Sequence, residues 1–147
     1  MKRITRSAIV EHSAADMYAL VERIEAYPQF LPWCREARVR ERGAGRSVAT
    51  LAVGFKGMRY AFTTENENRE PAAIELRLLE GPFRHFAAHW RFAALGERAA
   101  RIEFAMEYQF AGAVVSRALG PLFESIADSM VEAFKRRADA VYGQAAH

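Results

Sequence analysis

The chain has 147 residues, of which 51% are apolar and 27% are charged, and its formal net charge is +3. A chain of this size and composition buries a sizeable core, which predicts one domain over residues 1–147 and excludes a disordered or fibrous protein. Its one cysteine, Cys34, excludes an intrachain disulfide framework. Arg, Glu or Gly interrupts every apolar run, so we expect neither a secretory signal nor a membrane span, and we expect a cytoplasmic protein.

Residues 3–11 alternate in polarity as a half-buried strand does, with Ile4, Ala8 and Val10 on one face. Arg6 falls on the same apolar face. We therefore expect this strand to lie near the edge of a sheet, where a charged side chain reaches water.

A short amphipathic helix follows. Ser13 and Asp16 have the spacing of a capping box, with Asp in place of the usual Glu. The apolar residues behind them recur at helical spacing: Met17, Leu20, Val21 and Ile24.

The segment 27–34, Tyr-Pro-Gln-Phe-Leu-Pro-Trp-Cys, has two prolines four residues apart and four large apolar side chains. The prolines exclude a regular helix through it, and the apolar side chains require burial. Two interpretations stay open: a packed loop that closes one end of the core, or a lid over a ligand tunnel. As a lid, we expect it to meet the start of the C-terminal helix.

Residues 36–110 alternate almost throughout and predict six strands. The turn signals between them are Gly43-Ala44-Gly45, Lys56-Gly57, Asn66 to Pro71, Gly81-Pro82 and Leu95-Gly96. One face is apolar and the other is charged, which is typical of an antiparallel meander with one wet side.

Residues 113–142 return to helical spacing, and Gly120-Pro121 should kink this helix. Its apolar stripe comprises Leu119, Leu122, Phe123, Ile126, Met130, Phe134, Ala138 and Val141. The order of elements predicts an α+β fold: a curved seven-stranded antiparallel sheet wrapped around the long C-terminal helix, with one or two short helices after the first strand. Aromatic residues on the inner face either hold the layers apart around an apolar cavity or pack solid.

Several stretches resemble the coenzyme-Q-binding branch of the START-like superfamily, and together they cover nearly the whole chain. They are Ile4-Thr5-Arg6-Ser7, segment 27–34, Phe62-Thr63-Thr64, Glu80-Gly81-Pro82-Phe83-Arg84, His89-Trp90-Arg91-Phe92, Arg101-Ile102-Glu103-Phe104 and Met130-Val131-Glu132-Ala133-Phe134. The resemblance implies a helix-grip fold with a hydrophobic tunnel. Ala88 stands where the family usually has glycine, which implies a narrower cavity beside Trp90.

The same resemblance implies three functions. The first is a carrier that binds ubiquinone or a related polyisoprenoid lipid for respiration, with transient contact at the inner-membrane surface. The second is a bacterial ribosome-association toxin that binds the large ribosomal subunit and blocks subunit joining. The third, from older descriptions of the family, is a polyketide cyclase or dehydratase.

No catalytic constellation stands out. His85 and His89 alternate with Phe86 and Trp90, so they should lie on the outer face, while His12 falls in a loop and His147 is terminal. No His or carboxylate cluster has metal-ligand spacing, no glycine-rich loop precedes a helix, and Cys34 should be a buried, inert thiol. We therefore expect a binding protein without catalytic residues, metal or required cofactor.

Two sets of site residues follow. The candidates for lining a hydrophobic ligand are Phe30, Leu31, Trp33, Tyr60, Phe62, Phe86, Trp90, Met106, Phe123 and Ile126. The candidates for contact with RNA or a lipid headgroup are Arg38, Arg40 and Arg42, which alternation places on one side of one strand. Glu36 and Glu41 dilute this stripe, so a solvated strand face is the other interpretation. The sequence leaves the oligomeric state open.

Overall fold

The computed structural model describes residues 1–143 and begins with strand β1, Lys2–Val10, followed by helix α1, Ala14–Glu22, and the 3-10 helix η1, Ile24–Gln29. The Ser13 hydroxyl caps α1 by accepting a hydrogen bond from the Asp16 N–H at 3.0 Å, which confirms the predicted helix start. Pro28 lies inside η1, so a short 3-10 helix passes through the first proline of segment 27–34.

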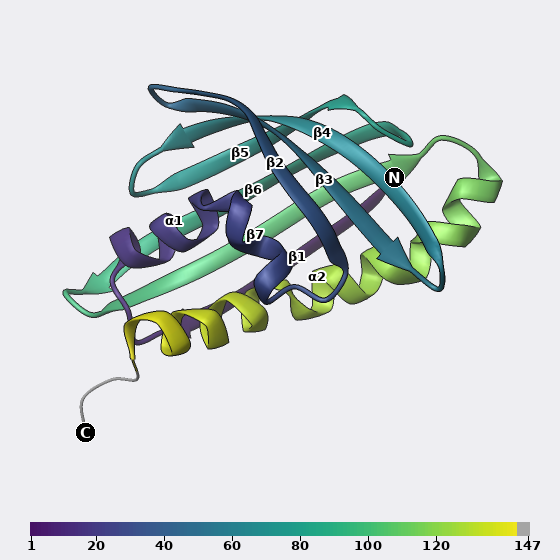
Figure 1. Cartoon of the computed structure of the whole chain (residues 1–147). Helices are drawn as coiled ribbons and strands as arrows, with labels where there is room; N and C mark the ends of the chain where they lie inside the picture. The colour runs from purple at the N-terminus through teal and green to yellow at the C-terminus, as the bar shows by residue number, and fades with distance from the viewer. Residues whose placement is uncertain (144–147) are drawn as a thin grey trace.

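The predicted strands between residues 36 and 110 are confirmed. They are β2, Cys34–Gly43; β3, Arg46–Phe55; β4, Met58–Arg69; β5, Ala73–Glu80; β6, Phe83–Gly96; and β7, Ala99–Phe110. All pairings are antiparallel, and the sheet order is β1-β7-β6-β5-β4-β3-β2. Strands β1 and β2 are therefore the two edges of one curved sheet (Figure 1).

Strand β4 is longer than the turn signals predicted. Asn66 pairs with Ser47 of β3 and with Leu76 of β5, and pairing continues to Arg69. The prediction of a turn starting at Asn66 is wrong, because the cross-strand hydrogen bonds on both sides outweigh the turn preference of asparagine. Asn66 instead lies inside the sheet.

Strand β2 contains a bulge that changes its faces. Val39 pairs with Ala49 and Glu41 pairs with Val48, so Arg40 is an extra residue between two consecutive pairs. Beyond it, Arg42 pairs with Ser47 and lies on the inner face. The prediction that Arg38, Arg40 and Arg42 share one side is therefore wrong.

Helix α2, Ala113–Tyr142, runs along the inner face of the sheet, with α1 and η1 beside its C-terminal half (Figure 1). Its predicted stripe is buried from Leu119 to Ala138, whereas Val141 is exposed. Pro121 lies within the helix and does not end it. None of the helices in residues 1–143 combines the length and apolar character needed to span a membrane.

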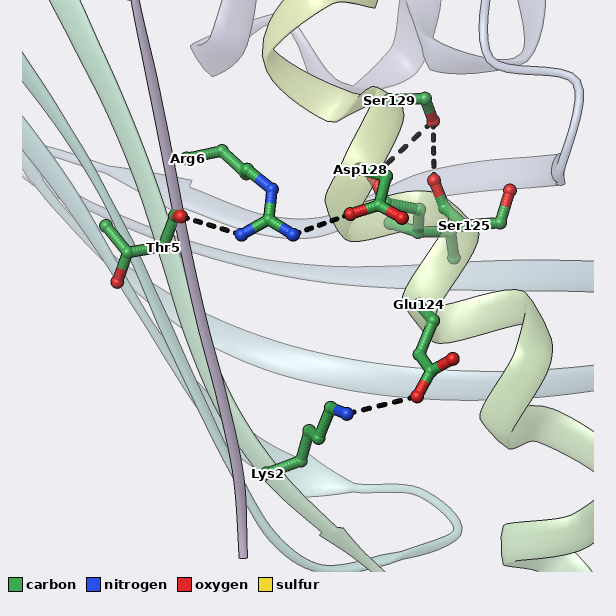
Figure 2. Close-up of polar contacts among 8 residues, drawn as sticks. Lys2, Thr5, Arg6, Glu124, Ser125, Asp128 and Ser129 are labelled. Atoms are coloured by element: carbon green, nitrogen blue, oxygen red, sulfur yellow. Dashed lines mark hydrogen bonds and ion pairs between the residues drawn. The ribbon is translucent and has the colours of Figure 1, made fainter.

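Two ion pairs join the edge strand β1 to α2 (Figure 2). The Lys2 Nζ lies 3.1 Å from the Glu124 carboxylate, and the Arg6 guanidinium lies 2.7 Å from that of Asp128. Arg6 thus sits on the inner face of an edge strand, as the alternation predicted.

Aromatic rings fill the inner space near the first half of α2. The Phe123 ring of the helix lies 5.3 Å from Phe83 and 5.6 Å from Tyr108, centroid to centroid, and Phe62 and Phe86 also belong to the cluster. These rings meet edge to face or tilted and are buried. At this end the aromatic side chains fill the space between the layers and do not hold them apart.

Candidate functional site

A cavity of about 30 Å³ lies between the inner face of the sheet and the cover formed by α1 and η1. Its lining consists of Val21, Glu22, Ile24, Tyr27, Ala49, Leu51, Thr64, Asn66, Asn68, Ile74, Leu76 and Trp90. This volume accommodates about one or two water molecules. It is far below the roughly 300–1,000 Å³ of ordinary small-molecule sites, so in this conformation the interior is nearly closed.

One side of the cavity is polar. Thr64 and Asn66 line this side, and Ser47, which lies outside the lining, is a hydrogen-bond partner of Asn66. We call Ser47, Thr64 and Asn66 the polar floor; they are 2%, 5% and 1% exposed. The Thr64 hydroxyl donates to the Asn66 Oδ1 at 2.7 Å, and the Asn66 Nδ2 donates to the Ser47 Oγ at 3.4 Å. Thr64 and Asn66 follow Phe62 at two-residue steps on β4, so the strand period carries polar side chains onto the apolar inner face.

The rest of the lining is mostly apolar, with Glu22 and Asn68 as its polar members. Leu51, Ile74 and Leu76 come from the strands on either side of the floor. Trp90 is buried, and its ring lies 5.1 Å from that of Phe134 on α2. The Tyr27 hydroxyl donates to the Val21 carbonyl oxygen, and burial raises the pKa of this tyrosine above its ordinary value. The Tyr27 hydroxyl therefore forms its hydrogen bond within the cover and does not donate into the cavity.

At the border of the cavity, an ion cluster ties the cover to the sheet. The Arg42 guanidinium of β2 donates to both oxygens of Glu25 at 2.9 and 3.1 Å and lies 3.4 Å from Glu22. We call these three residues the Arg42 clamp. The hydrogen bonds from Arg42 lower the pKa of the Glu25 carboxyl. The inward turn of Arg42 follows directly from the bulge at Arg40.

Of the ten predicted ligand-lining residues, Trp90 alone borders this cavity. Phe62, Phe86 and Phe123 belong to the aromatic cluster described above. The remaining candidates are packed elsewhere: Leu31, Met106 and Ile126 are buried, and Phe30, Trp33 and Tyr60 are half-buried.

Segment 27–34 packs against the C-terminal half of α2. The Phe30 ring lies 5.1 Å from the Phe134 ring, and the Arg137 guanidinium lies 4.9 Å above the Phe30 centroid. Arg137 also donates to the Gln29 Oε1 at 2.8 Å. The expectation that this segment meets the helix start at Gly120-Pro121 is therefore wrong for Gln29 and Phe30, whose partners Phe134 and Arg137 lie 13 and 16 residues beyond Pro121.

The outward arginines of β2 have local partners. Arg38 Nε lies 2.5 Å from a Glu36 carboxylate oxygen, and Arg40 Nε donates to the Thr50 hydroxyl at 3.2 Å. Glu36 also pairs with Arg59 at 2.7 Å.

The outer face of the sheet carries a hollow of about 750 Å³ that crosses from β1 to β3. Two of its carboxylates are paired with arginines of its walls: Glu65 contacts Arg46 and Arg77, and Glu107 contacts Arg3. Because both signs alternate along its walls, this hollow has no single charge that would select a polyanion.

The histidines lie away from the cavity. His85 and His89 are on the outer face, as predicted, where they contact Glu107 at 3.1 Å and Glu103 at 3.4 Å. His12 is buried and lies 2.7 Å from the Asp139 carboxylate of α2, a pairing that sequence spacing did not reveal. His147 lies outside the described residues.

Cys34 is buried, and burial raises the pKa of its thiol to about 11. Among residues 1–143, no three His, Cys, Asp or Glu side chains are grouped so that they could hold a metal ion.

Sequence reasoning missed the polar floor. The signal was present, because Thr64 and Asn66 are in phase with Tyr60 and Phe62. The turn signal at Asn66 ended the predicted strand too early, so the polar floor was not predicted.

Residues 10–135 match the family model for polyketide cyclase / dehydrase and lipid transport. The chain is 38% identical over 142 residues to the ribosome association toxin RatA of Escherichia coli, an alignment that covers 97% of this chain and 90% of that protein. It is 27% identical over 149 residues to the mitochondrial coenzyme Q-binding protein COQ10 homolog B of Xenopus laevis, covering 97% of this chain and 61% of that protein.

Two solved structures share the fold. The Zhui aromatase/cyclase of Streptomyces sp. R1128 superposes with a TM-score of 0.83 at 18% identity and covers 98% of this chain and 99% of that one. A START superfamily protein of Mycobacterium smegmatis superposes with a TM-score of 0.81 at 20% identity and covers 95% and 98%. The predicted START-like, helix-grip architecture is confirmed.

Proposed function

This chain belongs to the polyketide cyclase / dehydrase and lipid transport family, and on that premise we propose that it binds a hydrophobic molecule between its sheet and its helices and releases it unchanged. Ubiquinone or a related polyisoprenoid lipid is the proposed ligand, in the cytoplasm and at the inner-membrane surface. The observation that carries the proposal is the internal cavity, apolar on most sides and polar on one, under the cover of α1 and η1.

The cavity must enlarge to admit a ligand ring. The cover consists of the short helix α1 and the 3-10 helix η1, and the half-exposed Arg42 clamp holds it to the sheet edge. Displacing it exposes the residues that α1 and η1 bury, which are Ala14, Met17, Tyr18, Leu20, Val21, Ile24 and Tyr27. Burying an apolar chain contributes about 0.8 kcal/mol per methylene, so a long isoprenoid offsets that cost.

The polar groups that border the cavity favour binding over catalysis. They are hydroxyls and amides, with Glu22 as the one carboxylate, and Glu22 lies at the border beside Arg42. General acid–base catalysis needs a titratable side chain within hydrogen-bond reach of the reacting atom, whereas Glu22 is turned to Arg42 and the Tyr27 hydroxyl to the Val21 carbonyl oxygen. Of the three functions, that of a polyketide cyclase or dehydratase therefore has the weakest support.

The test is ligand content and uptake. Purified protein is extracted with organic solvent for mass spectrometry, and melting temperature is measured with added decylubiquinone. We expect a copurified lipid or a raised melting temperature. The variant Ala49→Leu, which fills the cavity wall, should abolish the shift, whereas Ala61→Leu on the exposed outer face of β4 should retain it. Absence of both lipid and shift in the wild type rejects the proposal.

A second candidate function is binding to the large ribosomal subunit, favoured by the 38% identity to a ribosome association toxin over 97% of the chain. Arg38 and Arg40 lie on the outer face of the edge strand β2, where a phosphate could replace their present partners. Arg42 is removed from this set because it belongs to the clamp.

Cosedimentation with isolated large subunits at low and moderate salt tests this candidate. Contacts with phosphate weaken steeply with salt. The pair Arg38→Glu and Arg40→Glu should reduce binding at low salt. Wild-type protein that stays in the supernatant at low salt rules the candidate out.

A further inference from the structure

We propose that the polar floor of Ser47, Thr64 and Asn66 recognises the oxygen-bearing head of the ligand, so that a carbonyl oxygen is bound by the Asn66 amide. This inference rests on the proposed function and adds to it the residues that recognise the ligand's head and the orientation in which the ligand binds. It predicts selection for an apolar molecule whose buried end carries a hydrogen-bond acceptor.

The polar floor has one hydrogen-bond donor that is not fully used, the Asn66 amide. The Thr64 hydroxyl proton is used on the Asn66 Oδ1. The Asn66 amide has two N–H donors, and the one directed at Ser47 makes a long contact of 3.4 Å. The buried Asn66 amide borders the cavity and can donate a further hydrogen bond. The complementary group on a ligand is therefore a hydrogen-bond acceptor and not a donor. Asn68, two residues on along β4 and also on the cavity lining, adds a second amide.

The position of the floor is hard to explain by folding alone. Its cross-strand neighbours on β5 are Leu78 opposite Thr64 and Leu76 opposite Asn66, so apolar side chains would continue the same wall. Burying amides and hydroxyls in such a wall costs stability unless every group is well paired. The cavity beside the floor accommodates about one or two groups of a water molecule's size without rearrangement, which is enough for the carbonyl oxygen to be recognised.

The adjacent residue supplies a matched control. The Thr63 hydroxyl lies 2.7 Å from the Thr50 hydroxyl, on the opposite face of the same two strands. Thr63→Val and Thr64→Val therefore remove the same atom at consecutive positions, one outside and one inside. Both changes keep the shape of the side chain, so a difference in ligand affinity between the two variants reports the role of the hydroxyl on the inner face.

The experiment compares decylubiquinone with dodecylbenzene, which is similarly apolar but has no oxygen, by isothermal titration. We expect the wild type to bind the quinone more tightly, and Asn66→Leu to weaken quinone binding about 3- to 10-fold, as loss of a neutral hydrogen bond does, without weakening dodecylbenzene. Thr64→Val should act in the same direction and Thr63→Val should change neither ligand. Circular dichroism melts confirm folding, and Thr64→Val carries the test if Asn66→Leu does not fold.

The outcomes separate the two proposals. In one outcome both ligands bind the wild type, and the floor variants either weaken the two affinities equally or change neither. Head recognition by the floor is then wrong, while ligand binding stands. If neither ligand binds the wild type, the proposed function fails and the inference fails with it.

Discussion

The Arg6 guanidinium lies 2.7 Å from the Asp128 carboxylate, and this contact spans from the edge strand β1 to the long helix α2. The two side chains are 47% and 65% exposed, so water and salt screen the pair. We expect the coupling energy from the double-mutant cycle of Arg6→Ala and Asp128→Ala to be about 1 kcal/mol or less. Urea unfolding at low and high salt measures it; a coupling well above this, or one that salt leaves unchanged, contradicts the prediction.

The Arg42 clamp should limit the rate at which the cover opens. Arg42→Ala removes its contacts with Glu22 and Glu25, so the rate of decylubiquinone uptake in stopped flow should rise several-fold. Arg38→Ala is the control, since Arg38 pairs with Glu36 on the other face of the same strand. Equal uptake rates in the wild type and both variants would show that the cover is not held by the clamp.

The clamp also predicts an acid dependence. Arg42 lowers the pKa of Glu25 in the folded protein, so the stabilisation is present above the unfolded pKa of this carboxyl and is lost as the pH falls through the folded value. Uptake should therefore accelerate on acidification in the wild type and change less in Arg42→Ala. A pH series of uptake rates, restricted to conditions where circular dichroism shows folded protein, checks this.

Segment 27–34 can be tested as a lid by comparing it with the core. Trp33 is half-buried, whereas Phe104 is buried and its ring lies 5.0 Å from that of Trp90. Phe104→Ala should cost about 3–5 kcal/mol of unfolding free energy. Trp33→Ala should cost less, because Trp33 is only half-buried, and on the lid interpretation it should reduce lipid retention more than Phe104→Ala does. If Trp33→Ala destabilises the fold as much as Phe104→Ala and keeps full ligand binding per folded molecule, the segment is structural packing.

Cys34 should be slow to react and should make stability depend on alkaline pH. Burial raises the pKa of its thiol to about 11, so little thiolate forms near neutral pH and labelling by iodoacetamide should be slow until urea unfolds the chain. Because the folded state keeps the proton that the unfolded state loses near pH 9, unfolding free energy should fall as the pH rises from about 9 to 11. Cys34→Ala should have a shallower slope over this range, and rapid labelling of the native protein at pH 7 would refute the burial argument.

The alternation of residues 36–110 and the helical period of residues 113–142 determined the strands, the long helix and the curved sheet without any structure. These signals are local, since each side chain's face follows from its position in a strand or helix of fixed period. The same rule placed His85 and His89 outside and Arg6 on the inner face at a sheet edge.

The site depended on contacts between distant residues. One extra residue at Arg40 turns Arg42 inward, and pairing with both neighbouring strands carries Asn66 past its turn signal into the core. Likewise, the partner of Phe30 on α2 and the cavity of about 30 Å³ follow from how the layers pack. The sequence by itself therefore determined which residues face inward along each regular strand and helix. The tertiary structure alone decided where this alternation is interrupted and how large the internal cavity is, because bulges and close packing depend on neighbours far apart in the chain.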